Sequence, residues 1–219
     1  MKKVYMTIMM ILFVFSATAC STNSDDALKF KDEYESMNGV VNEKTGKKTR
    51  SISIPNDNPI VYKSADDIVD AIENKETFVV YFGFSTCPWC RSVIEEFMDV
   101  LSNVKIKNVY YVDVKEIRDI LSLDDSNNVV IDSKGSDGYY RLLKSLNSVL
   151  DDYKLYDRDN NVVLAGEKRI YAPNIIYVKK GKIIGMTDGV SDKQTDGYMD
   201  LTDEMRRDSY NIFKELLDK

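Results

Sequence analysis

Two cysteines separated by two residues carry the chemistry that this sequence predicts. Cys87 and Cys90 follow a continuous apolar run at 78–84 and precede a segment in which apolar residues recur at helical spacing. Residues three positions apart lie on one face of a helix, so the two sulfurs can meet and form a disulfide. Free backbone N–H groups at a helix N-terminus favour a thiolate, which is the species that attacks disulfides. We therefore predict Cys87 as the nucleophile and Cys90 as the resolving thiol.

The composition weakens two other interpretations of the cysteine pair. A four-coordinate zinc site needs two further Cys or His ligands, but the chain has no histidine and one other cysteine, Cys20. A purely structural disulfide would close a loop too short to constrain the unfolded chain much. Redox exchange is the preferred interpretation, and we expect neither a metal nor a cofactor.

The elements that must position the cysteines are a strand and a helix joined by a tight turn. The run 78–84 is rich in β-branched and aromatic residues and too short for an ordinary helix, which predicts a buried central strand. Ser85 and Thr86 are N-cap types, and Pro88 suits a first helical turn. The apolar face of this helix is predicted at Val93, Ile94, Phe97, Val100 and Leu101.

The remaining elements alternate between strands and helices, which predicts an α/β fold with a largely parallel sheet. Strands are predicted at 60–62, 109–114, 175–178 and 182–186, with a candidate edge strand at 50–54. Helices are predicted at 26–37, from Ser64 onward, at 140–153 and at 201–217. Lys180-Gly181 predicts a hairpin between the last two strands. Residues 124–138 predict a loop or a small excursion, and no internal repeat is recognised.

The first residues predict export from the cytoplasm. Residues 1–19 combine two lysines, an apolar stretch and small residues, which is the plan of a signal peptide and too short for a comfortable membrane span. The cysteine that follows resembles the lipobox of bacterial lipoproteins, although Ala17 stands where that pattern most often has Leu. The resemblance implies that Cys20 is lipidated and anchors the protein to the outer face of the bacterial cell membrane. A plain cleaved signal and an uncleaved anchor are the alternatives.

The rest of the chain divides into a short N-terminal part and one main domain. Residues 20–58 are predicted as the lipidated cysteine, a tether and an N-terminal extension, and 59–219 as the domain. The tether is predicted at 21–26, where all residues are Ser, Thr, Asn or Asp. With 36 acidic against 30 basic residues and a net charge of −6, the chain has no electrostatic footprint for nucleic acid. We expect no nucleic-acid partner.

The order of the elements resembles the thioredoxin superfamily over residues 60–219. Two segments carry the resemblance, Cys87-Pro88-Trp89-Cys90 and Tyr171-Ala172-Pro173-Asn174. The resemblance implies a thioredoxin-like fold, in which a central mixed sheet is flanked by helices. It implies a cis peptide bond before Pro173, in a loop that offers backbone groups to an extended substrate, where the alternative is an ordinary trans proline. The substrate-binding residues that it implies are Pro88, Trp89, Ala172 and Pro173, and for Trp89 a role in covering the helix start is equally supported.

Three departures from the superfamily pattern limit what the resemblance implies. Many thioredoxins and protein disulfide isomerases have a buried acid six residues before the first cysteine, where this chain has Tyr81. The interval 114–173 is several dozen residues longer than usual, which predicts a helical insertion at about 115–166. The dipeptide Pro-Trp between the cysteines is closer to glutaredoxins and bacterial thiol oxidases than to the Gly-Pro of reductases. Redox direction depends on the stability of the reduced thiolate, so the dipeptide alone leaves it open.

Two functions from different classes follow. The first is a membrane-anchored thiol–disulfide oxidoreductase that exchanges disulfides with protein thiols and with a redox partner in the membrane or envelope. The second is a non-catalytic thioredoxin-like binding lipoprotein for export or assembly, of the kind represented by bacteriocin transport accessory proteins. Tyr81 and the insertion favour the second function, and the cysteine motif and its setting favour the first.

Overall fold

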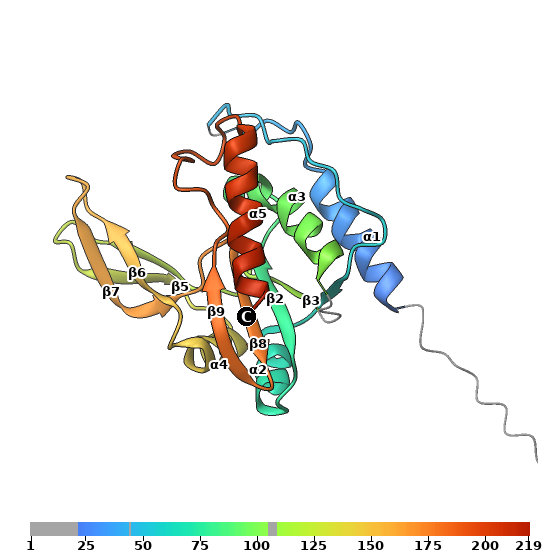
Figure 1. Cartoon of the computed structure of the whole chain (residues 1–219). Coiled ribbons are helices and arrows are strands. Elements are labelled where there is room, and N and C mark those ends of the chain that lie inside the picture. The colour runs from blue at the N-terminus through green and yellow to red at the C-terminus, as the bar shows by residue number, and fades with distance from the viewer. Residues whose placement is uncertain (1–21, 44, 105–108) are drawn as a thin grey trace, which may run out of the picture.

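The core of the protein is a five-stranded mixed sheet flanked by helices (Figure 1). The computed structural model describes residues 22–43, 45–104 and 109–219, so the predicted signal peptide and Cys20 lie outside the described residues. In spatial order the strands are β1 (Ile60–Tyr62), β3 (Val109–Asp113), β2 (Phe78–Gly83), β8 (Asn174–Lys179) and β9 (Lys182–Thr187). The β1–β3 and β2–β3 pairs are parallel, whereas β2–β8 and β8–β9 are antiparallel. The central mixed sheet that the resemblance implied is therefore confirmed. The expectation of parallel strands holds for β1, β3 and β2 but does not extend to the final hairpin, which joins the sheet antiparallel to β2.

Helices cover both faces of this sheet. Helices α1 (Thr22–Glu35), α3 (Pro88–Asn103) and α5 (Asp203–Leu217) pack on one face. Helices α2 (Ala65–Glu73) and α4 (Asp137–Leu146) pack on the other.

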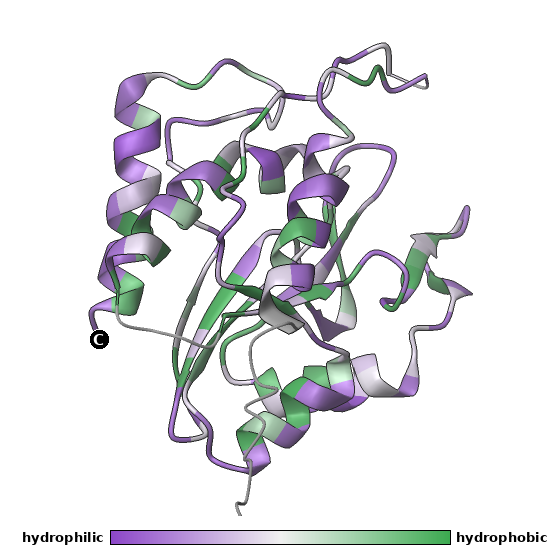
Figure 2. Cartoon of the chain, turned by 90° about the vertical axis from the view of Figure 1, so that its right-hand side faces the viewer, coloured by the Kyte–Doolittle hydropathy of each residue, from purple (hydrophilic) through white to green (hydrophobic). Residues whose placement is uncertain are grey.

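Strand β2 is buried along its whole length between these two helical layers. Its side chains alternate between the faces, so Val79 and Tyr81 join the first core and Val80 and Phe82 the second. The central strands are accordingly hydrophobic, and polar residues lie on the outer faces of the helices (Figure 2). A continuous apolar run in the sequence therefore reflects burial on both sides.

Helix α1 is part of the core. Phe30 and Tyr34 have no exposed surface and pack with the residues of β2 and α3. Residues 22–26, which the composition predicted as part of a flexible tether, form the beginning of this helix. The prediction of a tether there is wrong because two aromatic side chains further along α1 dock the helix on the sheet.

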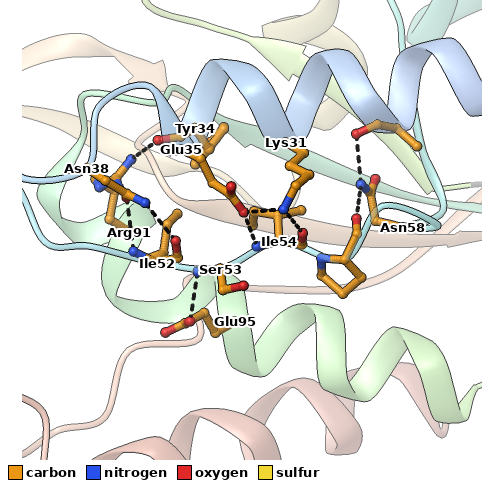
Figure 3. A network of polar contacts seen from close by, with 12 residues as sticks. Lys31, Tyr34, Glu35, Asn38, Ile52, Ser53, Ile54, Asn58, Arg91 and Glu95 are labelled. Atoms are coloured by element: carbon orange, nitrogen blue, oxygen red, sulfur yellow. Dashed lines mark hydrogen bonds and ion pairs between the residues drawn. The ribbon is translucent and has the colours of Figure 1, made fainter.

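The segment 50–54 is extended but forms no strand, so the predicted edge strand is wrong (Figure 3). Side chains rather than a neighbouring strand bind its backbone. The Ile52 N–H donates to the Asn38 side chain at 3.0 Å, and the Ile54 N–H donates to the Glu35 carboxylate at 2.7 Å. Ser53 N–H similarly donates to Glu95 of α3. The segment is thus fixed between α1 and α3.

The predicted helical insertion at about 115–166 consists mostly of hairpins. Strands β4 (Ile120–Leu123) and β5 (Val129–Ser133) form one, and β6 (Asp151–Tyr156) and β7 (Val162–Arg169) form the other. Of the two alternatives for 124–138, a simple loop is wrong, because β5 and the start of α4 lie within it, and the segment is part of a small excursion. The predicted helix at 140–153 is wrong at both ends. The helix begins after the N-cap Ser136 and ends at Leu146, and residues 151–153 belong to β6.

The two hairpins are copies of one sequence pattern. Residues 124–131 read DDSNNVVI and residues 157–164 read DRDNNVVL, so the statement that the chain has no recognisable repeat is wrong. Both turns have the same hydrogen bonds, in which the first aspartate accepts backbone N–H groups two and four residues later. Asn127 and Asn160 both have φ of 62°. The hairpins lie side by side and project from the body of the molecule (Figure 1), with the Arg158 side chain bonded to Asp125 across their tips.

Candidate active site

The two cysteines stand where β2 meets α3. Cys87 itself is the N-cap of α3, so the predicted N-cap candidates Ser85 and Thr86 lie before the cap. The Sγ of Cys87 accepts the backbone N–H of Cys90 at 3.3 Å, as an N-cap oxygen would. Both cysteines are free thiols, with Cys87 4% exposed and Cys90 fully buried. The N-cap position thus aims the sulfur of Cys87 at the free N–H groups of the first turn.

The surroundings of the two thiols shift their pKa values in opposite directions. A hydrogen bond from Cys90 lowers the pKa of Cys87 and outweighs burial, with help from the N–H groups of Cys90 and Trp89 and the charge of Arg118. Burial is the main cause that raises the pKa of Cys90 well above the ordinary value, and the adjacent Cys87 raises it further. Cys87 is therefore the thiol that ionises first, which is the order required of a nucleophile and a resolving thiol.

Arg118 carries a positive charge that helps to lower the pKa of Cys87, and sequence analysis did not select this residue. Its guanidinium lies 5.1 Å from the ring centre of Phe84, the residue that follows β2. The residue comes from the beginning of the insertion, between β3 and β4. No local pattern identifies such a residue, because its proximity to the cysteines depends on the fold.

The loop before β8 lies against Cys87. The Ala172–Pro173 peptide bond is cis, which confirms the predicted geometry. The Cys87 thiol donates to the Ala172 carbonyl at 3.3 Å. The two segments that carried the sequence resemblance, 85 residues apart, therefore meet at a single sulfur.

An open groove of about 650 Å³ lies beside this contact. Trp89, Ala172 and Pro173 line it on the cysteine side, and residues of β6, including Tyr156, line it from the second hairpin. Trp89 is half-buried and also packs against the core, so it both faces the groove and covers the helix start. Pro88 instead lies against Gly197. The atoms of Pro88 leave no room for a side chain at residue 197.

Tyr81 occupies the position where a buried acid is common in the superfamily that the sequence resembles. It is fully buried, and its hydroxyl lies 2.7 Å from that of Tyr34 on α1. It belongs to the same buried core cluster as Cys90. Burial, together with the neighbouring Cys90, keeps its pKa well above the ordinary value, so Tyr81 remains a neutral phenol.

Arg91 is a second residue that sequence analysis did not select. It is 1% exposed, and its guanidinium donates to the Tyr34 carbonyl and to the side chain of Asn38 (Figure 3). It also donates to the backbone carbonyls of Arg50 and Ser85. These bonds join α1, the extended segment 50–54 and the turn before Cys87. From the sequence, a charged residue next to a cysteine is expected to be exposed to solvent. The packing of α1 over the Arg91 side chain buries it instead.

Within the part of the chain that the structure describes, no group of three or more Cys, His, Asp or Glu side chains could hold a metal ion. Within the same residues, no helix is long and apolar enough to span a membrane. Comparisons of the chain with protein-family models, with curated proteins and with solved structures found no match.

Proposed function

We propose that the protein is a thiol–disulfide oxidoreductase with a thioredoxin-like fold. The observation that carries the proposal is the pair of thiols in opposite environments, one at a helix N-terminus with a lowered pKa and one buried with a raised pKa. The cis Ala172–Pro173 loop supports it, since the Ala172 carbonyl already accepts a hydrogen bond from the reacting sulfur. No cofactor is needed for exchange between sulfurs.

The reaction has two balanced steps. The Cys87 thiolate attacks one sulfur of a substrate disulfide, forms a mixed disulfide and releases the other substrate sulfur as a thiolate. Cys90 then loses its proton and attacks the sulfur of Cys87, which forms the Cys87–Cys90 disulfide and releases the second substrate thiolate. The substrate gains two electrons and the protein loses them. The same steps in reverse oxidise a substrate dithiol.

Trapping of the mixed disulfide tests the proposal. A Cys90→Ser variant keeps the nucleophile but cannot resolve the intermediate, so we expect it to accumulate substrate proteins linked through Cys87. Non-reducing electrophoresis and mass spectrometry would identify the linkage. The matched control is the Cys87→Ser, Cys90→Ser double variant, which should trap nothing. If the single variant forms no adduct at Cys87 in any of a series of glutathione buffers, the protein is not an oxidoreductase.

The reduction potential would decide the direction of the reaction. Trp89 is the single tryptophan of the chain and lies between the two cysteines, so its fluorescence should change when the disulfide forms. Titration in glutathione buffers gives the potential of the pair. A value near about −120 mV would mean oxidation of substrates, and a value near about −270 mV would mean their reduction.

The proposed location follows from the sequence of the first residues. Lipidation at Cys20 would anchor the protein on the extracytoplasmic face of the bacterial membrane, where its protein substrates and a redox partner in the envelope would meet it. A Cys20→Ser variant should lose incorporation of a labelled fatty acid and leave the membrane fraction. Equal fatty-acid labelling of the Cys20→Ser variant and the unaltered protein would exclude lipidation at this residue.

A non-catalytic binding function is the second candidate, and the hairpins favour it. Seven large apolar residues are exposed on them: Ile120, Val129, Val130, Ile131, Tyr156, Val162 and Leu164. Exposed apolar strands are typical of surfaces that bind another chain. If the protein acts by binding alone, the Cys87→Ala, Cys90→Ala double variant will retain function in cells, whereas an oxidoreductase will lose it.

A further inference from the structure

The groove beside Cys87 carries more negative than positive charge. Its acidic residues are Asp151 in β6 and Asp188 and Asp192 in the segment that follows β9. Lys154, also in β6, is the one basic residue among the described residues that line it. Three carboxylates against one ammonium group leave a net charge of −2 at neutral pH.

The protein itself does not neutralise these three carboxylates. All three are exposed, and within the described residues none of them forms an ion pair. By contrast, two other acids that do not line the groove are paired, Asp152 with Lys168 and Asp208 with Lys193. A cleft lined by unpaired charges of one sign raises the local concentration of ligands of the opposite sign. A cation is therefore the ligand that the charge of the groove favours.

A buried acceptor in the wall of the groove points to a hydrogen-bond donor as the ligand. Asn174 follows Pro173 directly and begins β8, and it is 4% exposed. Its side-chain N–H donates to Sδ of Met186, but its Oδ1 is buried without a hydrogen-bond partner in the described part of the chain. Such acceptors are rare in native proteins, because each keeps the cost of losing water. Since Asn174 lines the groove, a donor from a bound segment can supply the missing bond.

Two aromatic side chains in the same wall also favour a cation. Trp89 is half-buried between the two cysteines, and Tyr156 of β6 is 62% exposed. The ring faces of Trp and Tyr attract ammonium and guanidinium groups. Carboxylates, an unpaired acceptor and aromatic rings therefore line one groove, and all of them favour a positively charged donor over an anion.

We propose that this groove selects substrate segments that carry arginine or lysine close to the reacting cysteine. The inference rests on the proposed oxidoreductase function, because it names the class of polypeptide that reaches Cys87. Ala172 lines the groove and its carbonyl accepts the Cys87 thiol at 3.3 Å, so a side chain bound there lies close to the reacting sulfur. Asp151, Asp188 and Asp192 determine the selectivity.

The insertion before β8 supplies part of this selectivity. Its strand β6 contributes Asp151, Lys154 and Tyr156 to the groove, whereas the other two carboxylates come from the segment after β9. Without the insertion, the groove would keep the cis-proline loop but lose the wall that β6 forms. The charge of the groove therefore depends on both segments.

Peptide binding measured by the fluorescence of Trp89 tests the selectivity without requiring disulfide exchange. Trp89 lines the groove and is the single tryptophan of the chain. The ligand is the peptide Gly-Arg-Gly-Ser-Gly-Arg-Gly, in which serine replaces the cysteine, and its twin carries citrulline, which has nearly the shape of arginine but no charge. We expect the reduced full chain to bind the arginine peptide about tenfold more tightly, at the lower end of the effect of a charged cleft. The difference should largely disappear in about 1 M salt, which screens charges beyond about 3 Å.

Variants of the groove should change the preference in opposite directions. The triple variant Asp151→Asn, Asp188→Asn, Asp192→Asn removes the carboxylates, so the two dissociation constants should come within about twofold of each other. Lys154→Gln removes the opposing positive charge and should widen the difference. A purely structural role for these residues would not produce changes of opposite sign.

The matched control removes the same total charge from other places. Asp57→Asn, Glu73→Gln and Glu215→Gln together change three exposed carboxylates that do not line the groove. This variant has the same net charge as the groove triple variant and should keep the full preference for the arginine peptide.

Three results of the binding measurement would overturn the selectivity. The first is equal affinity of the unaltered protein for the arginine and citrulline peptides. The second is a preference that survives in the groove triple variant, because its carboxylates would then not be the cause. The third is an equal loss of preference in the control variant, because the total charge of the protein would then be the cause.

An exchange assay separates this inference from the proposed function. The same peptides, with cysteine restored, are supplied as mixed disulfides with a coloured aromatic thiol. The Cys87 thiolate attacks the peptide sulfur, the S–S bond of the mixed disulfide breaks, and the aromatic thiolate leaves. Each rate is divided by the rate with mercaptoethanol, which corrects for the reactivity of the peptide.

The two assays fail in different ways. Exchange at equal corrected rates with both peptides would overturn the selectivity and leave the oxidoreductase intact. If the unaltered protein releases no more aromatic thiolate than a Cys87→Ser variant, the proposed function is wrong. The fluorescence titration would still decide whether the groove binds cationic segments.

Discussion

The two cysteines differ in environment although they are three positions apart. Cys87 caps α3 and receives N–H groups at its sulfur, whereas Cys90 lies one turn deeper among aromatic rings. Two causes create this difference: the free N–H groups of the first helical turn lie at the Cys87 sulfur, and burial in the core surrounds Cys90. The proposed division into nucleophile and resolving thiol therefore depends both on position in the helix and on tertiary packing.

The charge of Arg118 should tune the nucleophile. Replacement by Gln removes a cation that lowers the pKa of Cys87, so we expect the pH profile for alkylation of Cys87 by iodoacetamide to move to higher pH. Mass spectrometry of the alkylated peptide over a pH series measures this. Arg141→Gln is the control, because Arg141 is exposed and pairs with Asp66. An Arg118→Gln profile identical to the unaltered one would contradict the prediction.

Arg91 should contribute strongly to the stability of the folded protein. Its replacement by Leu leaves several buried carbonyls without a donor, and we expect the free energy of unfolding to fall by about 3 kcal/mol or more. Denaturant unfolding followed by circular dichroism gives this value. Arg207 on α5 is exposed, so Arg207→Leu should change stability by less than about 0.5 kcal/mol. A similarly small loss in the free energy of unfolding for Arg91→Leu would contradict the prediction and show that water binds the carbonyls in place of the guanidinium.

At the scale of elements, the duplicated hairpin depends on one residue in each turn. Asn127 and Asn160 both adopt a left-handed backbone conformation. This conformation is unfavourable for most residues with a Cβ, whereas Gly adopts it freely and Asn adopts it more readily than the others. Asn160→Ala should destabilise the β6–β7 hairpin by about 1 kcal/mol. Hydrogen exchange of the amides in these strands measures the local effect.

Two matched variants test this prediction, one at Asn160 itself and one at Asn127, the equivalent residue of the other hairpin. Asn160→Gly keeps the turn conformation accessible and should leave exchange nearly unchanged. Asn127→Ala should act on β4–β5 and spare β6–β7. If Asn160→Ala and Asn160→Gly behave alike, the backbone conformation is not what stabilises the turn.

At the scale of the whole molecule, α1 and the sheet should unfold together. Phe30 on α1 is fully buried among tyrosines of β2 and β3, so Phe30→Ala should cost about 3–5 kcal/mol in one cooperative transition. Leu28 on the same helix is 45% exposed, and Leu28→Ala should cost less than about 0.5 kcal/mol. Separate transitions for the helix and the sheet, seen by circular dichroism and tyrosine fluorescence, would show that α1 is an independent unit.

Much of the fold could be predicted because its signals are local. The run before Cys87 contains the residues of a doubly buried strand, Ser64 forms a capping box with Asp67, and Lys180-Gly181 adopts the positive φ angles of a tight hairpin turn. Each signal depends on a few consecutive residues. The repeated pattern of the hairpins was also readable from the sequence and was missed, because the second copy diverges outside the turn.

The sequence by itself determined which two cysteines form the candidate site of this protein, and the tertiary structure decided what surrounds them. Two cysteines three positions apart after a buried strand lie close together, since helical geometry fixes the distance between neighbouring turns. The burial of Arg91, the contact of Cys87 with Ala172 and the hydrogen bond between Tyr81 and Tyr34 join residues from distant parts of the chain. No local propensity encodes these contacts, because they exist only when separate elements share one core and one set of hydrogen bonds.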